Sequence, residues 1–71
     1  RKSSTSTLTN KELEVLTLLA QGNKVRQIAE DLGLSVKTIE AHKLSIMRKL
    51  NVHTSIQLVH HAVKLGLIES V

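Results

Sequence analysis

Basic side chains cluster in one short stretch of this chain. Residues 35–50 hold four of its ten lysines and arginines against a single acid. The bases are Lys37, Lys43, Arg48 and Lys49, and the acid is Glu40. If this stretch is helical, it presents ammonium and guanidinium groups that can bind the phosphates of a polyanion. The chemistry that these residues predict is therefore non-covalent recognition.

Catalytic and metal-binding arrangements are not evident in the sequence. Serine, histidine and aspartate all occur, but no spacing places a nucleophile beside a base and an orienting group. No glycine-rich phosphate loop is present. His60 and His61 are adjacent and would point about 100° apart on a helix, and no cysteine or paired aspartate accompanies them. We therefore expect no enzyme activity, no metal and no cofactor.

A helix over residues 36–50 would position the basic side chains. At about 100° per residue, three apolar residues share one narrow sector and predict the buried face: Ile39, Ile46 and Leu50. The opposite side carries a mixed row, with Glu40 beside it: Lys37, Ala41, Leu44 and Arg48. Lys43 lies nearer the buried stripe, where its stem can cover apolar surface while its ammonium reaches out.

The first helix is predicted over residues 10–21. Thr9 and Glu12 have the spacing of a capping box, and Gly22 fits the left-handed position that follows a helix. The predicted stripe is Leu13, Leu16, Leu19 and Ala20, widened by Val15 and Leu18. Its apolar periodicity predicts that one face of this helix is buried.

The second helix is predicted over residues 24–32, with Asn23 as its N-cap. Its apolar residues have the i, i+3, i+4, i+7 spacing of a buried face: Val25, Ile28, Ala29 and Leu32. Gly33 ends this helix, and Ser35 is a favoured N-cap for the helix over 36–50. Such a short connection between two helices indicates a helix-turn-helix.

The fourth helix is predicted over residues 55–65, between a Thr54–Gln57 capping box and Gly66. Its core face is predicted to be Leu58, Ala62 and Leu65. A second apolar stripe lies on another face: Ile56, Val59 and Val63. A small domain does not need two apolar faces on its last helix, so this stripe predicts a partner surface for a second copy or an upstream domain.

Composition limits the class of protein. The 71 residues include no cysteine, proline or aromatic residue, so the small core must be aliphatic and helices are favoured over strands. The net charge of +4 favours a polyanionic partner, but RNA is disfavoured because no aromatic ring can stack on bases. No apolar run approaches the roughly 20 residues of a membrane span. The fold class is predicted as all-α: a flexible linker over 1–7, then a four-helix domain over 8–71.

In a helix-turn-helix, the second helix of the motif enters the major groove of double-stranded DNA. The start of the helix over 36–50 would offer the Ser35 and Thr38 hydroxyls and free N–H groups to a phosphate. Contacts that position the protein without reading sequence are predicted for Arg26, Lys37 and Lys49. Base edges are predicted to meet Glu40, Ala41 and Leu44, since glutamate can accept from cytosine and apolar groups can touch the thymine methyl. Lys43 and Arg48 complete the predicted DNA-binding set.

These spacings resemble the LuxR/NarL/FixJ-type helix-turn-helix domain over roughly residues 8–68. The resemblance is carried by Leu8, Thr9, Glu12, Val15, Leu16, Gly22, Ile28, Ala29, Leu32, Ser35, Thr38, Ile39, His42, Ile46, Lys49 and Leu50. Its most specific part mixes polar and apolar types at fixed spacing: Thr38-Ile39, His42, Ile46 and Lys49-Leu50. The resemblance implies a four-helix domain whose third helix reads the major groove.

The resemblance also implies partners. It implies a homodimer on DNA that forms through the fourth helix, for which we assign Ile56, Val59, His60 and Val63. It further implies the output domain of a two-component response regulator, controlled by a receiver domain before residue 1. RNA polymerase would be another partner, and the location would be the bacterial cytoplasm, at the nucleoid.

Five positions depart from the pattern of that family. Val25-Arg26 stands where many members have Asn-Lys, Asn51 where many have glycine, Ser55 where many have arginine and Glu40 where lysine is common. Arg26 keeps its charge, Ser55 removes a frequent anchor of the fourth helix, and Glu40 prevents any transfer of sequence preference. Two other hypotheses stay open: a protein–protein adaptor that uses the apolar stripe of the fourth helix, and a promoter-recognising module similar to a sigma-factor domain.

Overall fold

The computed structural model describes residues 8–69, which form four helices in the predicted order. They are α1 (Asn10–Ala20), α2 (Val25–Leu32), α3 (Val36–Leu50) and α4 (Ser55–Lys64). No strand occurs within residues 8–69, so the all-α prediction is confirmed there. No helix in that range is long and apolar enough to cross a membrane. The linker predicted over residues 1–7 lies outside the described residues.

Three residues that were predicted to be helical are instead caps. Gln21 and Leu65 are the C-caps of α1 and α4. Lys24, and not Asn23, is the N-cap of α2, and its side chain makes no capping hydrogen bond. The Asn23 side chain instead donates from Nδ2 to the carbonyl oxygen of Leu18 at 3.0 Å. The prediction for Asn23 was wrong because α2 begins one residue later, and this local bond turns the Asn23 side chain toward the end of α1.

Both predicted capping boxes are present. In α1, the Thr9 hydroxyl accepts from the Glu12 N–H at 3.1 Å, and the Thr9 N–H donates to Glu12 Oε1 at 3.0 Å. In α4, the Thr54 hydroxyl accepts from the Gln57 N–H at 3.1 Å, and Gln57 Oε1 accepts from the Thr54 N–H at 3.3 Å. Each box satisfies N–H groups that have no partner within a helix, which explains where α1 and α4 begin.

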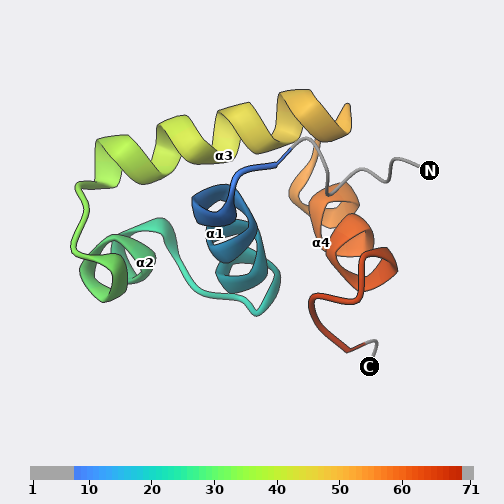
Figure 1. The fold of residues 1–71 in the computed structure, drawn as a ribbon, viewed down its shortest axis with the longest axis horizontal. Helices are drawn as coiled ribbons and strands as arrows, with labels where there is room; N and C mark the ends of the chain where they lie inside the picture. Colours follow the sequence, from blue (N-terminus) through green and yellow to red (C-terminus); the bar gives the residue numbers. More distant parts are fainter. Residues whose placement is uncertain (1–7, 70–71) are drawn as a thin grey trace.

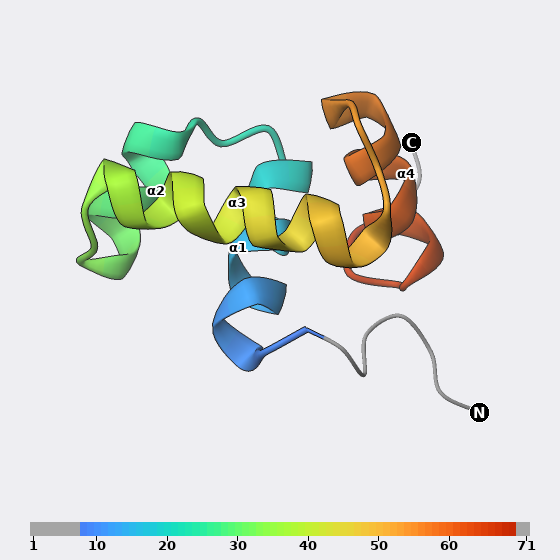
Figure 2. The same cartoon turned by 90° about the horizontal axis from the view of Figure 1, so that it is seen from above.

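The longest helix, α3, lies across the other three (Figure 1). In that view α1 is the middle helix beneath it, with α2 on one side and α4 on the other, and α1 contacts all three other helices. Figure 2 shows from above that α3 runs along the length of the molecule. One long side of α3 is therefore left uncovered by the other described helices.

The core beneath α3 is aliphatic and draws on all four helices. Its fully buried large side chains are Val15, Leu16, Ile28, Ile39, Ile46 and Leu58. The predicted buried faces of α2, α3 and α4 are confirmed by the burial of Ile28, Ala29, Ile39, Ile46, Leu50, Leu58 and Ala62. In α1, Val15 lies at the centre of the buried face, whereas Leu13 and Leu19 are only partly buried. The predicted stripe was displaced because α1 is covered by helices on several sides.

The connection from α2 to α3 is a tight turn. Gly33 has φ 69°, in the left-handed region that favours glycine. The N–H of Leu34 donates to the Ala29 carbonyl oxygen at 2.9 Å. Ser35 then caps α3 by accepting from the Thr38 N–H at 3.0 Å. The predicted helix-turn-helix geometry is therefore present.

The far end of α3 explains one departure noted in the sequence. Asn51 is the C-cap and has φ 56°, so its backbone is left-handed. Asparagine adopts this conformation more readily than other residues with a side chain. Its N–H donates to the Arg48 carbonyl oxygen at 3.2 Å, and Val52 after it is buried. Asparagine can thus end α3 at a position where glycine is common in the family that the sequence resembles.

Candidate nucleic-acid interface

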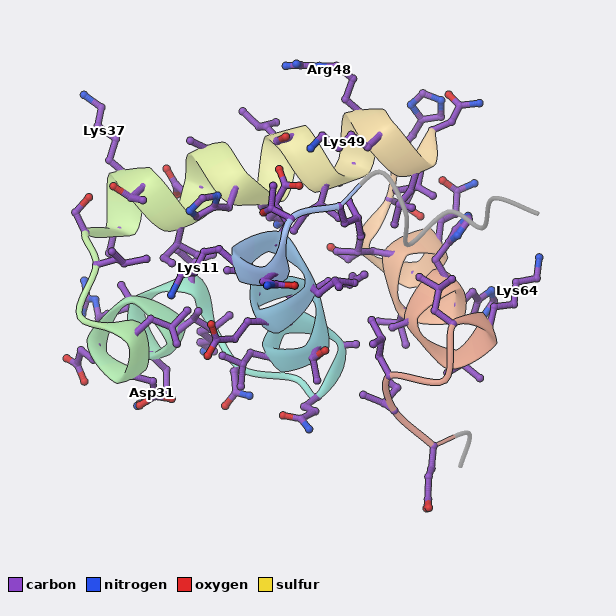
Figure 3. All side chains as sticks on the ribbon, viewed as in Figure 1. Lys11, Asp31, Lys37, Arg48, Lys49 and Lys64 are labelled. Carbon is purple, nitrogen blue, oxygen red and sulfur yellow. The ribbon has the colours of Figure 1, made fainter. Side chains whose placement is uncertain are left out.

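The side of α3 that faces away from the other helices is mixed in character and fully accessible. Lys37, Glu40, Ala41 and Arg48 are exposed, and Leu44 exposes 64% of its surface. Figure 3 shows Lys37 and Arg48 extending from α3 away from the rest of the molecule. We refer to these five residues as the outer face of α3. The structure places all five on the accessible side, as the helical periodicity predicts.

The dimensions of the outer face suit a groove of double-stranded DNA. From Lys37 to Arg48 it extends roughly 16 Å along the helix axis at about 1.5 Å per residue. That length corresponds to about five base-pair steps, and the major groove admits one α-helix. The outer face has a positive charge at each end, on Lys37 and Arg48, with Glu40, Ala41 and Leu44 between them.

The start of α3 carries the predicted hydroxyl pair. Ser35 Oγ accepts from the Thr38 N–H at 3.0 Å and lies 2.9 Å from Thr38 Oγ1. The Ser35 oxygen is therefore used inside the protein as a cap, while the positive end of the helix dipole lies beside it. Arg26 is exposed on α2. These groups suit the positioning of an anion, and none of them distinguishes one base from another.

Lys43 does not belong to the outer face. Its side chain is partly buried and borders a depression of about 280 Å³ that is also lined by Lys24, Leu58 and Val59. It also borders a second hollow beside Leu44. This position agrees with the sequence-based expectation that its stem lies against apolar side chains.

Lys49 is directed toward α1 and has a partner inside the protein. Its Nζ lies 2.7 Å from Oε1 of Glu12, and the Ser45 hydroxyl donates to Glu12 Oε2 at 2.7 Å. The side chain of Glu12 is 6% exposed and that of Lys49 is 33% exposed. Hydrogen bonds from Lys49, Ser45 and the Thr9 N–H lower the pKa of the Glu12 carboxyl from 4.5 to about 2. Figure 3 shows Lys49 on a different side of α3 from Lys37 and Arg48.

The contact of Glu12 with Ser45 and Lys49 could not be predicted from the sequence. The capping box accounts for Glu12 locally, and its α3 partners lie 33 and 37 residues further along the chain. The one usable signal is that Ser45 and Lys49 are four residues apart and so share a flank of the helix. A polar flank next to a buried row can receive a charged side chain from a neighbouring helix, but the pattern does not say from which one.

The exposed side of α4 carries the predicted apolar stripe in part. Ile56 exposes 70% of its surface and His60 is exposed, whereas Val59 and Val63 are partly buried. Beside the stripe, a depression of about 280 Å³ is lined by Asn51, Val52, Gln57, His60, His61 and Lys64. Figure 3 shows Lys64 extending from α4, well away from Lys37. Within residues 8–69 no three histidine, cysteine or acidic side chains are grouped so that they could hold a metal.

Comparison with known proteins identifies a matching family and relatives that are bacterial regulatory proteins. Residues 6–62 match the family described as "Bacterial regulatory proteins, luxR family". The uncharacterized response regulatory protein YgeK of Escherichia coli strain K12 is 48% identical over 66 residues, which cover 93% of this chain and 45% of YgeK. The oxygen regulatory protein NreC of Staphylococcus carnosus strain TM300 is 48% identical over 62 residues, which cover 87% of this chain and 29% of NreC.

A second NreC, from Staphylococcus epidermidis strain ATCC 12228, is 50% identical over 62 residues, which cover 87% of this chain and 28% of that protein. The chain therefore spans less than half the length of each of these three relatives. The family match extends from before α1 into α4 and includes the whole turn between α2 and α3. The chain is thus a helix-turn-helix domain that belongs to the luxR family of bacterial regulatory proteins, a family of DNA-binding transcription regulators.

Proposed function

We propose that this chain is the effector domain of a bacterial transcription regulator of the response-regulator type, and that it binds double-stranded DNA sequence-specifically with α3 in the major groove. The observation that carries this proposal is the outer face of α3, which is exposed, charged at both ends and set directly after a tight helix-helix turn. The names of the relatives YgeK and NreC, which are regulatory proteins, support the regulatory part.

The DNA-contacting residues divide into two groups by chemistry. One group positions the domain on phosphates and consists of Arg26, Ser35, Lys37, Thr38, Lys43, Arg48 and Lys49. The other group meets base edges and consists of Glu40, Ala41 and Leu44. A carboxylate such as Glu40 accepts a hydrogen bond from cytosine N4, and an apolar side chain such as Leu44 contacts the thymine methyl. Base pairs that offer these groups are therefore favoured in the binding site.

The apolar stripe on α4 pairs with the same stripe of a second copy in this proposal. Ile56 is the most exposed of its large apolar side chains, and His60 lies beside it on the solvent side. A two-fold interface buries the same patch on both copies, so one stripe is sufficient. The pair would then place two α3 helices on two half-sites of a symmetric operator.

Control of the domain by a receiver domain in the same protein, and contact with RNA polymerase in the bacterial cytoplasm at the nucleoid, complete this proposal. Similarity to YgeK, a response regulatory protein, supports the receiver-domain part of this proposal. A phosphorylation-controlled receiver would act by changing how readily two copies of this domain meet.

Selection of bound duplexes from a random DNA pool tests the proposed function. We expect a two-fold-symmetric motif, and affinity for it that falls steeply as salt is raised. Lys37→Ala should weaken binding and reduce the magnitude of the salt slope by about 1. The matched control is Lys64→Ala, which removes an exposed lysine from α4 and should leave both quantities close to wild type. Absence of duplex binding at low salt would contradict the proposal.

One observation favours a second candidate function. The 70% exposure of Ile56 is also what a protein–protein adaptor would show, with a different protein on the α4 stripe. In that case Val59→Asp should abolish function while Lys37→Ala has no effect. If DNA binding is the function, Lys37→Ala should weaken it directly, and Val59→Asp should mainly reduce the pairing of two copies on a symmetric site.

A further inference from the structure

One buried carboxylate of α1 holds two successive turns of α3. Glu12 Oε1 accepts from Lys49 Nζ at 2.7 Å and from the Thr9 N–H at 3.0 Å. Glu12 Oε2 accepts from the Ser45 hydroxyl at 2.7 Å. Both carboxylate oxygens are thus committed to protein donors, and the side chain is only 6% exposed. Such a group is costly to move because a shift leaves a buried charge without its partners.

The place of this contact on α3 gives it a specific consequence. At about 100° per residue, Ser45 and Lys49 lie on the flank between the buried row of Ile39 and Ile46 and the outer face. Apolar burial is non-directional, so it constrains the rotation of a helix about its own axis only through the shapes of the packed side chains. Two charge-assisted hydrogen bonds on one flank have defined directions. They therefore fix the rotation of α3 and, with it, the direction in which Glu40 and Leu44 point.

Lys49 can serve two partners at once. An ammonium group has three donors, and Glu12 takes one of them. The Lys49 side chain remains 33% exposed while its ammonium contacts Glu12, so it is accessible from the solvent side. A lysine held in this way has lost its side-chain freedom before DNA arrives, which reduces the entropic cost of a phosphate contact.

We propose that Glu12 is a positioning residue of the DNA-binding surface: through Ser45 and Lys49 it sets the rotation of α3 and holds the Lys49 ammonium for a phosphate. This inference rests on the proposed DNA-binding function, and it assigns that function a residue on α1, outside the helix-turn-helix. It gives an acidic side chain a favourable role in binding a polyanion. The sign of its effect is therefore opposite to that of an ordinary surface carboxylate.

The direction of the change in DNA affinity when the Glu12 charge is removed provides the test. Removing a negative charge from a DNA-binding domain ordinarily tightens binding, because repulsion by the phosphates falls. Glu12→Gln should instead weaken binding to the duplex that the wild-type domain selects by about tenfold, as for the loss of one good base contact. Glu14→Gln is the matched control, because Glu14 is on the same helix, is 49% exposed and contacts Lys11 at 3.4 Å. It should leave affinity unchanged or raise it slightly.

A double-mutant cycle tests whether the weaker DNA binding of Glu12→Gln arises through Lys49. Lys49→Met should weaken binding, and Glu12→Gln added to it should weaken binding little further, because both variants break the same contact. A purely structural role would lower the melting temperature without changing specificity. The measurement that separates the two is the ratio of affinities for the selected duplex and for a scrambled duplex, taken well below the melting temperature of each variant. This ratio should fall in Glu12→Gln, because base contacts depend on the rotation of α3 more than phosphate contacts do.

Ser45→Ala keeps the test decisive if Glu12→Gln does not fold. It removes one of the two α3 bonds to Glu12 and leaves the ion pair in place, and it should weaken specific binding by a few-fold. If the wild-type domain binds no duplex, the proposed function has failed. If the wild-type domain binds but Glu12→Gln and Ser45→Ala match or exceed it in affinity and specificity, the role of Glu12 is contradicted and DNA binding stands.

Discussion

The inner and outer faces of α3 belong to one helix and meet opposite surroundings. On the inner face, Ile39 and Ile46 are fully buried against the other helices. On the outer face, Leu44 exposes 64% of its surface, and Lys37 and Arg48 extend away from the molecule (Figure 3). The inner face contributes stability by removing apolar surface from water. The outer face contributes little to stability, so its side chains are available for recognition.

The flank that carries Ser45 and Lys49 joins these two faces. It carries polar side chains, as parts of the outer face do, yet its bonds to the buried Glu12 carboxylate are internal, like the contacts of the inner face. A change on this flank is therefore expected to affect both stability and binding. If this comparison is correct, substitutions on the inner face should change mainly stability, those on the outer face mainly DNA binding, and those on the flank both.

The largest effect is expected on the inner face. Ile46→Ala removes a fully buried side chain and should lower the free energy of unfolding by about 2–5 kcal/mol, from lost burial and the cavity left behind. Denaturant titration measures this. Leu44→Ala is the control on the outer face of the same helix, and it should change the free energy of unfolding by less than about 0.5 kcal/mol. Equal destabilisation by the two variants would show that the faces are not separable.

The contacts of the flank with Glu12 should make the stability of the protein depend on pH in the acid range. The pKa of the Glu12 carboxyl is about 2 in the folded protein and 4.5 in the unfolded chain. A lowered folded-state pKa stabilises the fold above the unfolded value, so this contribution is present above pH 4.5 and is lost as pH falls toward 2. We expect a loss on the order of 3 kcal/mol across that window, because each unit of pKa difference corresponds to about 1.4 kcal/mol. The free energy of unfolding, measured by denaturant titration between pH 6 and 2, reports it.

Glu12→Gln isolates this contribution from other carboxyl groups that titrate in the same range. The variant should be less stable than wild type at neutral pH, because a neutral amide pairs less well with the Lys49 ammonium. The difference between the two proteins should shrink as pH falls from 4.5 toward 2, because Glu12 is protonated over that range in the unfolded wild-type chain and only near pH 2 in the folded protein. A difference that stays constant across the window would exclude Glu12 as the group responsible.

A smaller effect, this time on binding alone, is expected from Leu44→Ala on DNA. The variant should weaken binding to the selected duplex by roughly tenfold, and should lose preference at one base-pair position of each half-site. Binding assays with duplexes altered at single positions measure this. The thermal midpoint should remain close to that of wild type. An even loss of affinity across all duplexes would instead assign Leu44 a role in positioning.

The parts of this molecule that follow local rules could be predicted from its sequence. The capping boxes at Thr9 and Thr54 and the left-handed Gly33 depend on residues within a few positions of each other, and the structure contains them. Asn23 was assigned to the wrong helix because its side chain can be directed toward the end of α1 or the start of α2, and the sequence does not rank these two orientations. The burial of Glu12 depends on how α1 crosses α3, which is a long-range result of packing.

The candidate site likewise contains side chains whose direction could be predicted from the sequence and one whose direction could not. The outward direction of Lys37, Leu44 and Arg48 follows from helical periodicity once the buried row is known, so it could be predicted. The inward direction of Lys49 could not, because its partner comes from another helix. Its charge suggested a phosphate contact, whereas the structure gives it a carboxylate first.

The smallest effect on the free energy of unfolding is expected at the exposed Lys11–Glu14 ion pair of α1, which can be compared with the Lys49–Glu12 pair. The Lys11–Glu14 pair has an N–O distance of 3.4 Å with side chains 47% and 49% exposed, whereas Lys49 and Glu12 are 2.7 Å apart with 33% and 6% exposure. Water solvates both members of the exposed pair almost as well apart as together, so Lys11→Met should change the free energy of unfolding by less than about 0.5 kcal/mol. Lys49→Met should lower the free energy of unfolding clearly more, since it leaves the Glu12 carboxylate buried without its cation.

Denaturant titration at low and high salt compares the two variants. The small effect of Lys11→Met should vanish in high salt, and that of Lys49→Met should largely persist. Equal costs would mean that burial of Glu12 adds nothing to the ion pair, and the flank would then belong with the outer face.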